Sequence, residues 1–244
     1  MRALILIGIL LIPTLGHAAV TVDAVTSGEA MNVGDIGFNH TGAADATLAL
    51  ACITERDTAL SIGAGPSATY GGNAMTLVPG ATQTQATRLK TSLFYYVSPP
   101  SGSQAFAVTK STNANRSIAT VVTLKGTATT SIFNTAGTNG ADTGTNLNVD
   151  GLASAVGEFA VLCGQQSTNA PVVSANATAP VSTELTEVDH SDGTGLTHFM
   201  YTESGASSSI NMRVDSDTSI YWSAVAVSIR AATGNSFGPL RRRQ

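Results

Sequence analysis

Few side chains in this chain carry the chemistry that enzymes and metal sites use. Of its four histidines, His17 lies in an apolar leader, which leaves His40, His190 and His198 for the rest of the chain. No G-x-S-x-G elbow, P-loop or H-E-x-x-H motif occurs in the sequence. We therefore predict no catalytic residues and no enzyme activity. We expect His40 in a turn and His198 in a strand, where a local hydrogen bond satisfies its ring.

Acidic side chains gather once, at Glu184, Glu187, Asp189 and Asp192. Oxygen ligands suit calcium, and Asp189 and Asp192 could hold it in an exposed loop, although their spacing is not that of an EF-hand. The alternative is a solvated turn without any cofactor. The run Asp215-Ser216-Asp217 is also expected to be a turn, because Asp and Ser favour turns.

Aromatic residues provide the candidate binding surface. In the segment 89–97, Leu89, Leu93, Tyr95 and Val97 alternate with Lys90, Ser92, Phe94 and Tyr96. If the first set faces the core, Phe94 and Tyr96 lie on the opposite face, where they could stack on sugar rings together with Trp222 and Tyr201. The alternative is that loops cover this face and enclose the rings in a minor core.

The two cysteines lie in apolar runs that read as strands. Cys52 follows 48–51 and Cys163 follows 159–162, and alternation points both side chains toward the apolar side. In an oxidising compartment they could form one disulfide across the core. They could equally be two free buried thiols that behave as small hydrophobes. No C-x-x-C spacing suggests a metal site.

The residues discussed above lie in short segments in which apolar and polar residues alternate. Clusters of Gly, Asn, Asp, Pro and Ser separate these segments. They predict strands at 20–25, 48–54, 75–78, 89–97, 106–108, 118–124, 147–149, 159–163, 198–202, 210–214 and 221–230. Polar, loosely patterned intervals separate them at 127–145 and 167–183. We find no convincing helical periodicity and no repeat of 20–50 residues. The pattern predicts an all-β fold, an antiparallel β-sandwich or jelly roll, in a single domain at 19–233.

Composition supports this fold class. Ala, Thr, Ser and Gly make up nearly half of the 244 residues, only 11% are charged, and 43% are hydrophobic. A helical bundle needs more Glu, Lys and Leu, and a nucleic-acid-binding protein needs more basic residues. Hydrophobic content this high also argues against a disordered chain.

Both ends of the chain have their own character. Met1-Arg2, an apolar run to Leu15 and the small residues before Ala18 match a secretory signal peptide at 1–18. No other window approaches the length of a membrane-spanning helix, so we expect a secreted or cell-surface protein. Residues 234–244 form an expected flexible tail with Arg241, Arg242 and Arg243, which is most simply a solvated terminus.

Three segments resemble a poorly characterised β-sandwich domain of secreted bacterial and some phage structural proteins. They are Asn39-His40-Thr41-Gly42, Tyr70-Gly71-Gly72-Asn73-Ala74-Met75-Thr76, and Phe94-Tyr95-Tyr96-Val97-Ser98-Pro99-Pro100-Ser101-Gly102. Trp222 fits the closing strand of that domain. The resemblance implies a sandwich fold and a structural setting, and it transfers no active residues.

These observations favour an exported, non-catalytic β-sandwich with a structural or adhesive role at the cell surface or in an extracellular assembly. Its partners would be further copies of itself or an extracellular glycan or protein. The alternatives are a carbohydrate-binding module and a virion decoration protein.

Overall fold

The computed structural model describes residues 19–31, 34–58, 61–85, 88–141, 145–167, 172–173, 182–190, 195–205, 208–216 and 221–233. The expected signal peptide and basic tail lie outside these residues. Every regular element in the described part is a strand, and all strand pairings are antiparallel. The all-β sandwich class is therefore confirmed. No described segment is a helix long and apolar enough to cross a bilayer.

The first half of the chain builds two sheets. Its inner sheet has the order β1-β9-β3-β7-β6, with strands Thr21–Met31, Arg116–Lys125, Leu48–Arg56, Leu89–Val97 and Thr76–Gln85. Its outer sheet has the order β2-β8-β4-β5, with strands Ile36–Gly42, Gly102–Thr109, Ser67–Tyr70 and Asn73–Ala74. The first four strands alternate between the sheets, and the first strand pairs with the last. This wrapping is that of a jelly roll.

The second half repeats this topology. Its inner sheet has the order β10-β17-β12-β15-β14, with strands Phe133–Ala141, Trp222–Ile229, Phe159–Gln166, Thr197–Ser204 and Thr183–Asp189. Its outer sheet has the order β11-β16-β13, with strands Asn146–Ala153, Ser209–Ser216 and Val172–Val173. Replacing β1, β9, β3, β7 and β6 by β10, β17, β12, β15 and β14 converts one inner sheet into the other. The matching cysteines of the two halves are 111 residues apart, a far longer repeat than those of solenoids and propellers.

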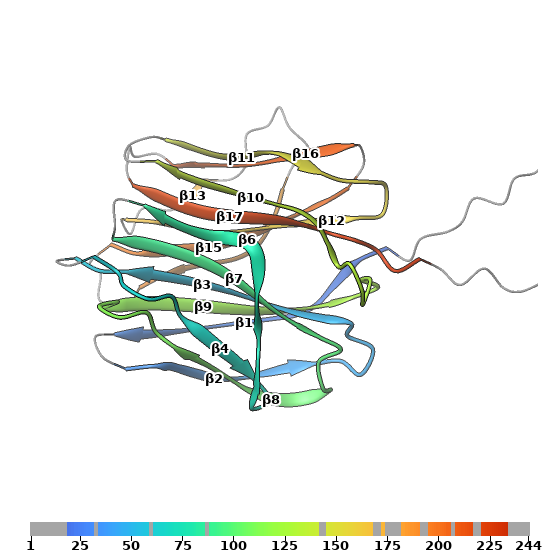
Figure 1. The fold of residues 1–244 in the computed structure, drawn as a ribbon, viewed down its shortest axis with the longest axis horizontal. Coiled ribbons are helices and arrows are strands. Elements are labelled where there is room, and N and C mark those ends of the chain that lie inside the picture. The colour runs from blue at the N-terminus through green and yellow to red at the C-terminus, as the bar shows by residue number, and fades with distance from the viewer. Residues whose placement is uncertain are drawn as a thin grey trace, which may run out of the picture.

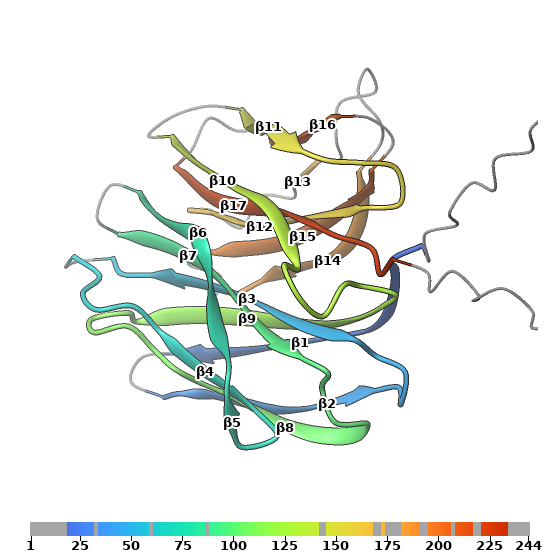
Figure 2. The same ribbon diagram turned by 45° about the vertical axis from the view of Figure 1, so that its right-hand side comes forward.

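The four sheets stack as layers, with the two inner sheets face to face in the middle (Figures 1 and 2). Strand β6 packs against β10 and β17, β7 against β17 and β12, β9 against β15, and β1 against β14. When the two halves are exchanged, the contact of β1 with β14 becomes the contact of β10 with β6. In the same way, the contact of β9 with β15 becomes that of β17 with β7. The halves are therefore related by an approximate twofold axis that passes between β3 and β12, as in an isologous dimer.

Three hydrophobic cores separate the four layers. The middle core lies between the inner sheets and contains Leu50, Leu93, Val122, Val161 and Val227 among others. One further core lies between each inner sheet and its outer sheet. Each inner sheet is therefore covered on both faces. This explains why β3, β12 and β17 are buried almost throughout and read as continuous apolar runs.

The strands expected from alternation are present, but several local predictions were wrong. His40 lies in β2, and Asp215 and Ser216 lie in β16, where turns were expected. Glu184, Glu187 and Asp189 lie in β14 and not in a solvated turn, and β10 and β13 lie inside the intervals 127–145 and 167–183. In each case few large apolar residues mark the strand. Outer strands need only one apolar face, and β10 places small residues against a neighbour: a Cβ on Gly137 would come within 2.7 Å of Val149 Cγ1.

Candidate functional site

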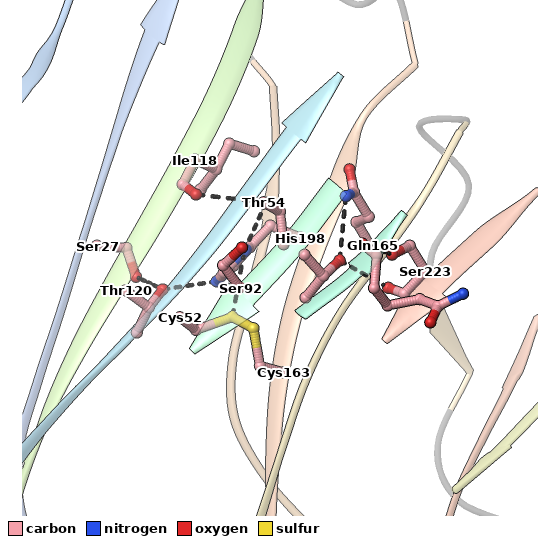
Figure 3. The surroundings of a disulfide bond; sticks show 12 residues. Ser27, Cys52, Thr54, Ser92, Ile118, Thr120, Cys163, Gln165, His198 and Ser223 are labelled. Carbon is pink, nitrogen blue, oxygen red and sulfur yellow. Dashed lines mark hydrogen bonds between the residues drawn. A yellow bond between two sulfur atoms is a disulfide. The ribbon is translucent and has the colours of Figure 1, made fainter. Parts of the chain in front are cut away.

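The centre of the molecule is a disulfide between the two inner sheets. Cys52 of β3 and Cys163 of β12 are bonded, with their Cα atoms 5.6 Å apart (Figure 3). Both residues are fully buried and occupy equivalent positions in the two halves. The sequence left open whether these cysteines form a disulfide or remain two free thiols, and in the structure they form the disulfide. A residue on a twofold axis meets its own equivalent, which is why two cysteines at matching places can bond.

A buried histidine lies beside the disulfide on one side. His198 Nδ1 lies 2.9 Å from Thr54 Oγ1 and 3.9 Å from Cys52 Sγ, and His198 Nε2 lies 2.8 Å from Thr120 Oγ1. Thr54 Oγ1 donates its own proton to the carbonyl of Ile118. The network therefore places the ring proton on Nδ1, which donates to Thr54, while Thr120 donates to Nε2.

Complete burial lowers the pKa of His198 to about 3, so the ring is neutral near pH 7. Its hydroxyl partners satisfy a neutral imidazole and supply no negative charge to stabilise an imidazolium. As expected, His198 is a strand residue, but its hydrogen bonds reach across the layers to β3 and β9 and are not local.

The equivalent positions in the other half form a matching contact. Gln165 corresponds to Thr54, and Thr91 corresponds to His198. Gln165 Nε2 donates to Thr91 Oγ1 at 3.1 Å and to the Lys90 carbonyl at 2.7 Å, and Thr91 Oγ1 donates to the Ser223 carbonyl at 3.0 Å. Figure 3 shows both polar groups beside the disulfide. Hydrogen bonds on both sides of the disulfide thus join the two halves.

The expected sugar-stacking rings are inside the protein. Trp222 and Tyr201 are buried between the second pair of sheets, where Phe199 contacts both rings edge to face. Phe94 is buried between the first pair, and Tyr96 packs partly buried against the same core. The prediction of an exposed aromatic platform was wrong. The rings lie in a second core, as the alternative had it, but a sheet covers that face instead of loops.

The candidate calcium ligands are only half described. Asp189 ends β14 and accepts a hydrogen bond from the Thr197 hydroxyl, whereas Asp192 lies outside the described residues. His190 between them is buried, with Nδ1 3.9 Å from a carboxylate oxygen of Glu29. Among the described residues, no three His, Cys, Asp or Glu side chains gather as a metal site would require.

His40 belongs to a polar network that ties three strands of the first half together. Its Nδ1 lies 3.0 Å from Thr26 Oγ1 and its Nε2 3.3 Å from Thr123 Oγ1, and the Thr123 hydroxyl donates to Asp23 at 3.0 Å. Burial lowers the pKa of His40, and the backbone N–H of Ala43 lowers the pKa of Asp23. Sequence reasoning missed this network, because its members lie far apart in the chain.

Two clefts open at equivalent places on the seam between the halves. The first has a volume of about 420 Å³ and contains the rings of Tyr95 and Phe133, whose centroids lie 5.0 Å apart in an edge-to-face arrangement. Its lining consists of Pro79, Tyr95, Val97, Thr129, Ser131, Ile132, Phe133, Asn134, Thr135 and Ala136.

The second cleft has a volume of about 410 Å³ and a different lining. It is formed by Val22, Phe159, Thr183, Leu185, Thr202, Glu203 and Ser204. Exchanging the halves brings Tyr95 onto Thr202 and Phe133 onto Val22. Of these two clefts, therefore, only the first carries a pair of aromatic rings.

No family model, no curated protein and no solved structure matches this chain.

Proposed function

We propose that this chain is an exported structural or adhesive module, held together as one rigid body and contacting neighbours through an outer sheet. The observation that carries the proposal is the buried disulfide between the halves. Disulfides persist in oxidising compartments, so the bond agrees with the signal-peptide pattern of residues 1–18. A covalent link across the middle core also suits a protein that has to persist outside the cell.

The outer sheet of the first half supplies the contact surface. Its four strands, β2, β8, β4 and β5, contain no Asp, Glu, Lys or Arg. The side chains that it exposes are small and uncharged, and include Asn39, Thr41, Ala105 and Ala107. Burying such a face against a partner costs little charge desolvation, and small side chains allow close approach.

The export part of the proposal is tested by expressing the full chain in a bacterium with an oxidising periplasm. We expect cleavage near residue 18, recovery outside the cytoplasm, and no thiol that reacts after denaturation. A cytoplasmic, uncleaved chain with two reactive thiols would contradict export and would favour the virion alternative.

The contact part is tested by placing charge on the outer sheet. Ala105→Lys and Ala107→Glu change exposed side chains, so the fold is expected to persist. Light scattering and electron microscopy of the purified chain should show assemblies or surface association that either variant abolishes. Val156→Lys is the matched control, because Val156 is 75% exposed but lies outside this sheet. A wild-type chain that is strictly monomeric and binds no surface would contradict the proposal.

Carbohydrate binding is a second candidate, now at the first seam cleft. Tyr95 and Phe133 are half-buried there beside hydroxyls of Thr129, Ser131 and Thr135, a combination that suits a neutral sugar. A glycan array tests it: binding should be lost in Tyr95→Ala and kept in Thr202→Ala at the equivalent position. An array without any signal would rule this candidate out.

A further inference from the structure

A third pocket, of about 390 Å³, lies where the twofold axis leaves the middle core. It is lined by Arg56, Asp57, Thr58, Arg88, Leu89, Ser167 and Tyr221. Arg56 and Ser167 stand at equivalent places at the ends of β3 and β12, so the pocket lies at the junction of the two halves. Ligand sites occur preferentially at such junctions.

Two guanidinium groups reach this pocket. Arg56 Nη1 donates to the Ser167 carbonyl at 3.2 Å, and Arg88 Nη1 donates to the Thr58 carbonyl at 3.2 Å. A guanidinium carries five N–H donors, so it can hold a backbone carbonyl and an oxyanion at the same time. Asp57 adds one negative charge to the wall, and the lining keeps a net positive charge.

The surrounding charge is also unusual for this molecule. Arg116 lies directly opposite Arg56 in the pairing of β9 with β3, so both side chains lie on the same face. Their side chains therefore bring two positive charges to one place on the sheet. Lys90 adds no charge to this face: it lies directly opposite Glu55 on the other face of the sheet and donates from Nζ to the Gly63 carbonyl. The three arginines Arg56, Arg88 and Arg116 thus gather at this end, although the part of the chain between leader and tail has 8 basic and 16 acidic residues.

The approximate symmetry shows that packing does not require these arginines. The second half has Ser167, Gly195 and Tyr221 where the first half has Arg56, Arg88 and Arg116. It forms the same end of an inner sheet without a cation at any of the three positions. The positive charge at this end therefore belongs to the first half alone, and it lies beside the pocket.

Tyr221 gives the pocket a second kind of contact. Its side chain is 46% exposed, which makes it one of three exposed large hydrophobic residues in the described chain. We propose that this pocket binds an oxyanion carried on a ring or apolar body. Arg56 and Arg88 hold the charged oxygens through paired N–H donors, and the Tyr221 ring contacts the body of the ligand. This site is independent of the proposed contact surface.

The test titrates the full chain with three probes at low ionic strength and follows binding by calorimetry and amide chemical shifts. Benzoate carries charge and ring, inorganic sulfate carries charge alone, and benzyl alcohol carries the ring alone. We expect benzoate to bind best, sulfate next and benzyl alcohol least, and added salt to weaken benzoate binding.

Substitutions separate the two contacts. Arg88→Gln and Arg56→Ser, which copies Ser167, should each weaken benzoate and sulfate binding at least about tenfold. Tyr221→Ala should weaken benzoate more than sulfate. Arg213→Gln, on the outer sheet of the other half, is the control and should change neither. The proposal is overturned if no anion binds saturably, if benzyl alcohol binds as well as benzoate, or if the arginine variants, folded by circular dichroism, bind as the wild type does.

Discussion

The two halves of this molecule share one topology but solve the same packing problems with different residues. At one end of the first half, the Asp23 carboxylate accepts from the Ala43 N–H at 2.8 Å and the Thr123 hydroxyl at 3.0 Å, and pairs with Lys125. In the second half Asn134 stands at the place of Asp23, and the carboxylate comes from Glu158.

Glu158, directly before β12, makes the corresponding contacts. It accepts from the Ala155 N–H at 2.9 Å and the Ser228 hydroxyl at 3.1 Å, and its other oxygen lies 4.0 Å from Arg230 Nε. The position of Glu158 corresponds to Thr47. Both halves thus place a partly buried carboxylate at this point, but they supply it from different positions in the chain.

On the outward face of the inner sheets, the two halves place a large side chain on different strands. In the first half Ile53 of β3 lies opposite Ser92 of β7, and in the second half Gly164 of β12 lies opposite Phe199 of β15. The large residue has moved to the neighbouring strand. A Cβ on Gly164 would clash with the Phe199 ring. The two halves therefore fill the same space and pair a carboxylate at the same place, but they use different residues to do so.

Removing the disulfide should have the largest effect, because the bond links the equivalent sheets covalently. The bond closes a sequence separation of 111 residues. We expect Cys52→Ala with Cys163→Ala to lower the free energy of unfolding by about 4–5 kcal/mol. Denaturant unfolding measures it, with reduced wild type as the control. Equal stability of wild type and variant would contradict a constraining role.

Acid should destabilise the protein through His198, whose counterpart in the other half is the uncharged Thr91. Burial puts the pKa of His198 at about 3, below its ordinary 6.5, so the unfolded state binds the proton more readily. This contribution to stability is complete above pH 6.5 and is lost as the pH falls toward 3, by about 1.4 kcal/mol per unit. At pH 4 the loss is about 3 kcal/mol.

Unfolding measured between pH 7 and pH 4 tests this expectation. His198→Gln keeps hydrogen-bonding groups without a titrating ring, so its curve should be flatter than that of the wild type. Parallel curves would show that other groups, such as His40, dominate the acid response.

Adding a side chain at Gly164 should lower the free energy of unfolding somewhat less than acid does through His198. Gly164→Ala places a methyl group against the Phe199 ring and should destabilise by about 2–3 kcal/mol. Gly164→Ile with Phe199→Ser copies the pair found in the first half and should recover much of that loss. Thermal unfolding of the single and double variants measures the coupling, and purely additive effects would refute the exchange of volume between strands.

Removing the Glu158 carboxylate should have the smallest effect, because the group is partly exposed and water can replace some of its contacts. Glu158→Thr copies Thr47 and should cost about 1 kcal/mol. Adding Asn134→Asp returns the carboxylate to the strand that carries it in the first half and should restore stability. Chemical denaturation measures the cycle, and a double variant no more stable than the single one would show that the two positions are not interchangeable.

Alternation in the sequence was enough to predict most of the strands, including β3, β7, β9, β12 and β17. Inner strands are easy to recognise, because apolar residues dominate them. Strands β2, β4, β5, β10, β13 and β14 were missed. Strand β2 exposes one face, β10 is rich in Gly, Thr and Asn, β14 is largely polar, and β4, β5 and β13 are very short. The duplication was also missed, because its period is far longer than the 20–50 residues of common repeats. The matching apolar settings of Cys52 and Cys163 carried a signal for it.

The sequence alone determined the all-β class, the low content of charge and the apolar positions of both cysteines, because these follow from composition and from a period of two. It could not determine what covers the second face of each strand. Alternation shows that a strand has two faces, but only the stacking of four sheets decides that Phe94, Trp222 and Tyr201 are core residues. The same stacking brings Cys52 to Cys163 and His198 to Thr54, since these contacts join the inner sheets of two halves that are distant in the chain.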